Sequence, residues 1–304
     1  MTHHWGYVSA VASAVLFGIS SALNKIVLQD VNPIVTAGTI YLIGGVVLLG
    51  IHLSPLCSKF LAMFETAETE AKITRKDARI LAFVILCGSV TAPFLLMSGL
   101  EKTTAINASL LLNAESLFTV LIALVLLKER CSKQEYIGVL IMAVGVVFIT
   151  TNAEFQHLTL AQNLIGNLAI IGACLFWGID NNLSKFLSKK QDILLVTGLK
   201  CFIGGGALFL VSFLVGASFY IPLVSVPYLL SVGAFSIAFS LLLFLFALRK
   251  IGSMRTATIF STSSLFGAVI AFLILKETFT IVQLIAGLVM LLGVYVIYRA
   301  CNHR

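Results

Sequence analysis

Long apolar stretches recur along nearly the whole chain and constrain its fold more than any other feature. Each has about 20 residues, and a helix of that length crosses a hydrocarbon layer of about 30 Å. The stretches are continuous rather than alternating, which favours helices over barrel strands. The ten stretches are 5–28, 33–53, 79–99, 104–127, 133–151, 163–187, 193–215, 226–248, 254–275 and 279–299. The sequence therefore predicts an all-α integral membrane protein with ten transmembrane helices.

Composition agrees with this prediction and excludes other classes of protein. Hydrophobic residues make up 59% of the chain and charged residues 11%, which is too little polar surface to cover a water-soluble globule. The net charge of +7 comes from short basic clusters between the apolar stretches, so we expect no nucleic-acid partner. The cysteines are scattered singly without the spacing of metal ligands, so we expect neither a disulfide framework nor a metal site. These cysteines are Cys57, Cys87, Cys131, Cys174, Cys201 and Cys301. We expect no cofactor either.

The basic residues indicate how the chain crosses the membrane. With the N-terminus inside, 16 Lys and Arg residues fall in cytoplasmic segments and 3 in external ones, while Lys200 lies within an apolar stretch. Positive charge accumulates on the cytoplasmic side of membrane proteins. We therefore expect a multi-pass protein of the cytoplasmic membrane with both termini in the cytoplasm. The stretch 5–28 is too long for a signal peptide and lacks a basic segment before it, so we expect it to remain.

The chain contains an internal duplication. The segment 104–129 recurs as 252–277 at an offset of 148 residues, and the first two apolar stretches recur at an offset of 160. This divides the chain into repeats 1–152 and 153–304, each with five predicted helices. Because five is odd, the second repeat enters the membrane from the opposite side. Such inverted repeats occur in secondary transporters, where the substrate binds near the midplane between the halves.

Several motifs carry a resemblance to a known family. FGISSALNK (17–25) and FWGIDNNLSK (176–185), AESLF (114–118) with LKER (127–130), and FALRKIGSMRTA (246–257) resemble conserved patterns of EamA domains. Both repeats resemble such a domain, so the chain is similar to transporters of the drug/metabolite transporter superfamily. It departs from the family pattern at Ser116, where the family has Pro, and at Phe17, where it has Trp.

One acid lies in the middle of a predicted helix. Glu115 is about 11 residues from either end of the stretch 104–127, where an ionised side chain costs about 2.5–3.5 kcal/mol. Its counterpart in the second repeat is Ser263, so the acid is not duplicated. We interpret Glu115 as a substrate contact or proton carrier in a central cavity. The alternative is a carboxyl group hydrogen-bonded to its neighbours for packing.

A helical projection of this stretch separates polar from apolar residues. Within an arc of about 160° around Glu115 lie Ser109, Asn113, Ser116 and Thr119. On the opposite side lie Ile106, Leu110, Leu117, Leu121 and Leu124. We expect the polar face to meet the protein interior and the apolar face to meet lipid.

Two further charged residues lie within predicted helices. Asp180 and Lys200 are each about seven residues from the cytoplasmic ends of neighbouring helices, so we expect them at one depth. Their counterparts in the first repeat, Ser20 and Ile40, are uncharged. A structural ion pair is one interpretation, and a gating or coupling site is the other.

Other residues complete the predicted site or have structural alternatives. The candidate substrate contacts are Glu115, Asn113, Ser116, Thr119, Trp177, Asp180, Asn181, Ser261, Ser263 and Ser264. For the three serines of the ninth stretch, hydrogen bonding between helices is the alternative. We expect the glycines at 44–45 and 204–206 to serve helix packing. Lys276 and Glu277, at the end of a helix, are expected to be membrane anchors.

The resemblance implies a secondary transporter that exports a small polar metabolite, an amino acid or a related compound, by alternating access. No GxxxxGKS motif occurs in the sequence, so ion gradients would supply the energy, with proton coupling through Glu115 as one option. Two other classes remain as alternatives, a flippase for lipid carriers and a polytopic membrane enzyme. For an enzyme, neither an HExxH motif nor a Ser-His-Asp pattern is evident. The sequence makes no prediction about oligomeric state.

Overall fold

The computed structural model describes residues 2–55, 57, 74–125, 133–151, 163–188 and 192–302. All regular elements within these ranges are helices. Nine helical spans there are long and apolar enough to cross a membrane, and the shorter apolar helix Tyr136–Thr151 provides a tenth. The prediction of an all-α membrane protein with ten transmembrane helices is confirmed.

The elements fall into five spans per repeat. Those of the first repeat are α1 (Thr2–Val27); α2 (Pro33–Leu53); α4 (Arg75–Val84) with the π-helix η1 (Ile85–Thr91) and α5 (Ala92–Glu101); α6 (Ala105–Leu111) with α7 (Ala114–Val125); and α8 (Lys133–Thr151). Those of the second are α9 (Leu164–Ser188); α10 (Ile193–Leu214); the 3-10 turn η3 (Leu223–Ser225) with α11 (Val226–Ser231), the π-helix η4 (Val232–Phe239) and α12 (Ser240–Ile251); α13 (Ser253–Phe260) with α14 (Ser263–Leu275); and α15 (Ile281–Asn302).

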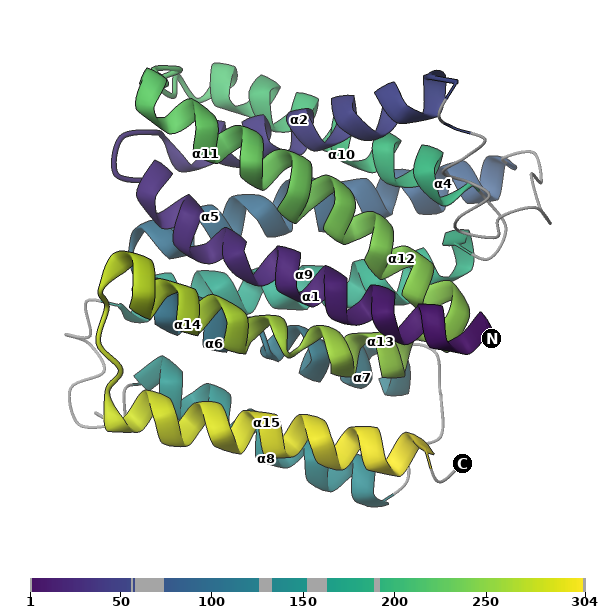
Figure 1. The fold of residues 1–304 in the computed structure, drawn as a ribbon, viewed down its shortest axis with the longest axis vertical. Coiled ribbons are helices and arrows are strands. Elements are labelled where there is room, and N and C mark those ends of the chain that lie inside the picture. The colour runs from purple at the N-terminus through teal and green to yellow at the C-terminus, as the bar shows by residue number, and fades with distance from the viewer. Residues whose placement is uncertain are drawn as a thin grey trace.

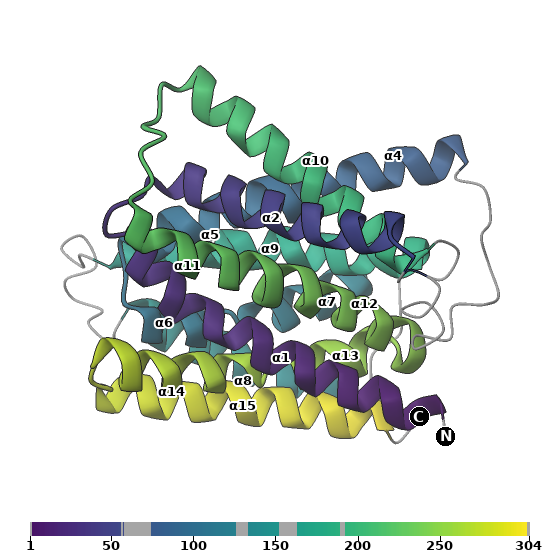
Figure 2. The same cartoon turned by 45° about the horizontal axis from the view of Figure 1, so that its top comes forward.

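The helices lie side by side, and equivalent helices of the two repeats make equivalent contacts (Figure 1). Helix α2 packs against its counterpart α10 along one edge of the bundle, and α8 packs against its counterpart α15 along the other. Both pairs remain together in the turned view (Figure 2). Between them, α1 packs against α12 and α14, as α9 packs against α5 and α7. The centre of the bundle is therefore built from both repeats.

Equivalent caps begin equivalent helices. The side chain of Asn32 accepts the N–H of Ile34 at 3.0 Å at the start of α2. At the start of α10, the carboxylate of Asp192 accepts the N–H of Leu194 at 2.8 Å. An N-cap side chain satisfies a backbone donor that the helix leaves unpaired. These caps fix where the second span of each repeat begins.

Glycines allow α2 and α10 to approach closely. A Cβ atom on Gly45 would lie 2.5 Å from the backbone nitrogen of Phe202, and one on Gly205 would lie 2.6 Å from that of Leu42. Real Cβ contacts of this length do not occur, so only glycine fits at these two positions. The prediction that the glycines at 44–45 and 204–206 serve helix packing is confirmed for Gly45 and Gly205 but not for Gly206, where a Cβ atom would meet nothing within 4 Å.

The third and fourth spans of each repeat are irregular, although their sequences predict continuous helices. The π-helices η1 and η4 interrupt the two third spans at equivalent positions. The fourth spans break at 112–113 and 261–262, where the N–H groups of Asn113 and Thr262 bond to carbonyl groups three residues earlier. At these positions, hydrogen bonds to the carbonyl three residues earlier replace the α-helical bonds to the carbonyl four residues earlier. The periodicity of apolar residues alone does not reveal such a change.

The prediction that one face of the stretch 104–127 meets lipid is wrong for most of that face. Ile106 is fully buried, and Leu110 and Leu117 are only 3% and 6% exposed. The span lies in the interior, where α6 packs against α14 and α7 against α9. An apolar helix face contacts protein as readily as lipid, so hydropathy could not distinguish the two environments.

Candidate functional site

A polar cavity lies within the bundle, where the two repeats meet. Its polar lining comprises Glu115 from the first repeat and Asp180, Asn181, Ser184, Thr197 and Lys200 from the second. Its volume is about 30 Å³, which is room for about one water molecule. The helices therefore close tightly around these groups.

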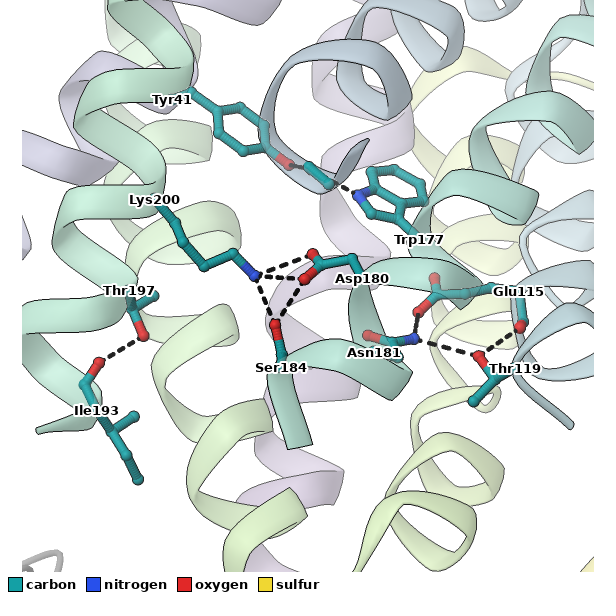
Figure 3. Close-up of polar contacts among 11 residues, drawn as sticks. Tyr41, Glu115, Thr119, Trp177, Asp180, Asn181, Ser184, Ile193, Thr197 and Lys200 are labelled. Carbon is teal, nitrogen blue, oxygen red and sulfur yellow. Dashed lines mark hydrogen bonds and ion pairs between the residues drawn. The ribbon is translucent and has the colours of Figure 1, made fainter. Parts of the chain in front are cut away.

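Asp180 on α9 and Lys200 on α10 form an ion pair in this cavity (Figure 3). The ammonium nitrogen of Lys200 lies 2.7 Å and 2.9 Å from the two carboxylate oxygens and 3.1 Å from the hydroxyl oxygen of Ser184. Ser184 in turn donates to Asp180 at 2.6 Å. Lys200 thus has three acceptors for its three N–H groups. The predicted pairing of Asp180 with Lys200 is present.

Glu115 is the second acid of the cavity and has no basic partner among the described residues. It lies in the first turn of α7, directly after the break in the fourth span, and is 8% exposed. One carboxylate oxygen accepts from the amide nitrogen of Asn181 at 2.7 Å (Figure 3). Asn181 also donates to the hydroxyl of Thr119 at 3.3 Å, which holds the amide in place. The other carboxylate oxygen, Oε2, receives no hydrogen bond from any described residue.

The net charge of the cavity follows from these contacts. Asp180 and Lys200 neutralise each other, so an ionised Glu115 leaves the cavity with one net negative charge. A charge buried without a partner is costly in a membrane protein. A proton or another cation at Glu115 would remove this net charge.

Aromatic rings form the apolar part of the cavity wall. The ring centre of Phe17 lies 6.0 Å from that of Trp177 and 5.1 Å from that of Phe260, whose ring in turn lies 4.9 Å from Phe244. The four rings come from α1, α9, α12 and α13, so both repeats contribute. Neighbouring rings therefore contact one another along the apolar part of the lining.

Gly88 in the π-helix η1 orients two further groups of the site. Its carbonyl oxygen accepts from the indole nitrogen of Trp177 at 3.0 Å and from the hydroxyl of Tyr41 at 3.4 Å. A Cβ atom at this position would overlap the carboxylate of Asp180. Gly88 therefore lets η1 approach the ion pair. Sequence reasoning missed it, because its role depends on a contact with a helix far away in the chain.

The remaining predicted site residues lie outside the described lining of the cavity. Ser116 donates to the carbonyl oxygen of Ala257 at 3.1 Å and also bonds to Ser261, which joins the fourth spans of the two repeats. Ser116 and Thr119 line a second, smaller pocket. Ser263 and Ser264 are buried, and Asn113 is buried with neither side-chain polar atom hydrogen-bonded within the described part of the chain.

At one end of the bundle, two charges hold the connection between α5 and α6, a contact that we call the Lys25 corner. Lys25 donates to the carbonyl oxygens of Leu100 and Thr103, both at 2.6 Å, at the C-terminus of α5. Glu277, which follows α14, accepts the N–H groups of Ala105 and Ile106, both at 2.9 Å, at the N-terminus of α6. Each charge has the sign that the adjacent helix end favours. Glu277, expected to be an anchor, therefore also joins the two repeats.

The fold and the cavity define a duplicated, multi-pass α-helical membrane protein with a polar site between its repeats. Residues 4–151 and 164–299 match the EamA-like transporter family. The chain is 38% identical to an uncharacterized transporter of Methanothermobacter thermautotrophicus over 98% of this chain and 87% of that relative. An uncharacterized transporter of Clostridium kluyveri is 23% identical over 98% of this chain and 94% of its own length. The chain belongs to the EamA-like transporter family, and the resemblance noted from its motifs is confirmed.

One solved crystal structure is also similar, with a TM-score of 0.69 over all of this chain and 98% of the other. The two sequences are 16% identical, so this likeness shows the fold alone. The predicted division of the chain at 152–153 lies outside the described residues and stays a prediction.

Proposed function

We propose that this chain is a secondary transporter that exports a small polar metabolite, an amino acid or a related compound, from the cytoplasm. The substrate binds in the cavity around Glu115. The observation that carries the proposal is an acid that has no basic partner among the described residues and lies in a small cavity lined by both repeats. A carboxylate in that position is costly unless it binds something that arrives and leaves.

Alternating access accounts for the size of the cavity. A volume of about 30 Å³ is smaller than an amino acid, so the helices must part before a substrate enters. The π-helices η1 and η4 and the breaks in the fourth spans lie in matching places of both repeats. Irregular turns of this kind are common at sites where helices bend. They are the hinges about which one repeat rocks against the other.

The Lys25 corner closes one end of the pathway. Its contacts link α1 to the end of α5 and the segment after α14 to the start of α6. The distribution of basic residues supports an orientation in which this end faces the outside of the cell and both termini lie in the cytoplasm. Opening toward the outside then requires Lys25 and Glu277 to release the two helix ends.

Uptake by reconstituted vesicles tests this proposal. Purified protein in liposomes is offered a panel of labelled amino acids, amines and other small metabolites, with and without a proton gradient. We expect saturable uptake of at least one compound that empty liposomes do not take up. If no compound is moved but a lipid-linked carrier crosses the bilayer, the protein is a flippase. Chemical conversion of a panel compound would instead favour a membrane enzyme.

A further inference from the structure

We infer that the substrate is a primary amine with an apolar remainder, and that it needs no carboxylate group. This inference rests on the proposed function and narrows its substrate class from amino acids and related compounds to amines. Three observations carry it. They are the net charge of the cavity, the use of all three N–H groups of Lys200 by protein acceptors, and the aromatic rings in the cavity wall.

The charge balance selects for a cation. Glu115 keeps one carboxylate oxygen without a hydrogen bond from the described residues, and the only other acid of the cavity, Asp180, is neutralised by Lys200. A substrate ammonium group at that oxygen would form a charge-assisted hydrogen bond and remove the net charge. A substrate without positive charge would leave an ionised Glu115 unpaired and would need Glu115 to carry a proton instead.

Lys200 is not available for a substrate carboxylate. Its three N–H groups are used by the two oxygens of Asp180 and by Ser184. To bind an anion, Lys200 would have to give up a buried partner, which leaves the charge of Asp180 uncompensated. The described lining contains no other basic side chain, so the carboxylate of an amino acid would meet no cation here.

The aromatic wall suits both parts of an amine. Trp177 and Tyr41 direct their polar ends to the carbonyl of Gly88, so what they offer a ligand is ring surface. Phe17, Phe244 and Phe260 also line the cavity, so aromatic rings make up much of its apolar wall. Rings attract ammonium groups by cation–π contact and also accommodate apolar chains. A carboxylate beside such rings gains neither interaction.

Binding of matched ligands tests this inference without transport. The chain has two tryptophans, and Trp5 is 64% exposed and outside the cavity lining, so in a Trp5→Phe background the fluorescence of Trp177 reports the cavity. We use two sets of three ligands. Within each set the ligands share one apolar group and differ only in their charged groups. One set is phenethylamine, phenylalanine and 3-phenylpropionate, and the other is isopentylamine, leucine and 4-methylpentanoate.

In each set we expect the amine to bind about tenfold or more tightly than its amino acid, and the acid to bind most weakly. Glu115→Gln should weaken amine binding by a similar factor. Asp30→Asn, which removes an exposed carboxylate after α1, should leave it unchanged. Equal or tighter binding of the amino acids would overturn the inference while leaving the proposed function intact. The inference also fails if no ligand of either set binds, and uptake of the wider panel then decides the proposed function separately.

Discussion

The backbones of the two repeats match in their irregularities, whereas their buried charges do not match. The π-helices η1 and η4 interrupt equivalent spans, and the breaks in the two fourth spans correspond to within one residue. By contrast, Glu115 corresponds to Ser263 in the second repeat, and the pair Asp180 and Lys200 corresponds to Ser20 and Ile40 in the first. The cavity thus takes one acid from the first repeat and an ion pair from the second.

Under the proposed function, this difference separates the parts that would move from the parts that would bind. An inverted repeat rocks symmetrically only if both halves bend at equivalent places, so the hinges are present twice. A single substrate molecule in the cavity has no such symmetry. Its binding groups therefore need to be present only once. The predictions below convert residues of one repeat toward their counterparts in the other.

The largest effect is expected at the ion pair. Lys200→Ile introduces the residue of the first repeat and leaves Asp180 buried without its cation. We expect this to lower the stability of the folded protein by about 3–5 kcal/mol, because an unpaired buried charge is very costly. Asp180→Ser should have a comparable effect. The double variant Asp180→Ser/Lys200→Ile should recover much of the loss.

Thermal unfolding in detergent, followed by the fraction of monodisperse protein, measures these differences. If the double variant is no more stable than either single variant, the two charges act separately and the pair is not a structural unit.

The next largest loss of stability is expected for a substitution in the π-helix η1. Gly88→Ala places a methyl group against the carboxylate of Asp180, so the helices must shift apart. We expect a loss of about 1–3 kcal/mol in stability together with a lower transport rate. Gly50→Ala in α2 is the matched control, since a Cβ atom there meets nothing within 4 Å. Equal thermal stability of the two variants would show that Gly88 does not set the approach of η1 to α9.

A substitution at the equivalent position of the second π-helix, η4, should lower stability less than Gly88→Ala does. Ser236 in η4 is the counterpart of Gly88, and its hydroxyl donates to the carbonyl oxygen of Leu16 at 2.6 Å. Ser236→Ala removes this hydrogen bond but no charge and should cost about 1 kcal/mol. Thermal unfolding under the same conditions checks the order of the two effects. A larger loss for Ser236→Ala than for Gly88→Ala would contradict the account of the two repeats.

Orientation can be tested without any change of stability. Cysteine at position 218, in the exposed segment after α10, should react with an impermeant thiol reagent added outside intact cells. The native Cys301 near the C-terminus should not react. Labelling of Cys301 in intact cells would overturn the proposed topology.

Much of the architecture could be predicted from sequence because the cost of placing a side chain in lipid is local. Hydropathy found the spans, and the cost of buried charge singled out Glu115, Asp180 and Lys200. The repeat itself was visible as matching residues at fixed offsets. These signals need no knowledge of which helices touch.

The details of the site could not be predicted, because they depend on contacts between distant helices. The role of Gly88 exists only because η1 lies against Asp180, and that of Glu277 only because α6 begins beside it. A helical projection placed Asn113 on the face of Glu115, but the break at 112–113 changes the turn between them. Leucine has the same side chain whether it faces protein or lipid, so the burial of Leu110 and Leu117 within the protein could not be predicted from sequence either.

The central claim is that Glu115 is the functional acid of the cavity, and transport by Glu115→Gln tests it most directly. Glutamine keeps the shape and most of the hydrogen-bonding capacity but removes the titratable charge. We expect normal membrane abundance and thermal stability with transport lost or no longer responsive to pH, while the control Asp30→Asn transports as the unmodified protein does. Transport at the unmodified rate, with an unchanged response to pH, would contradict the account.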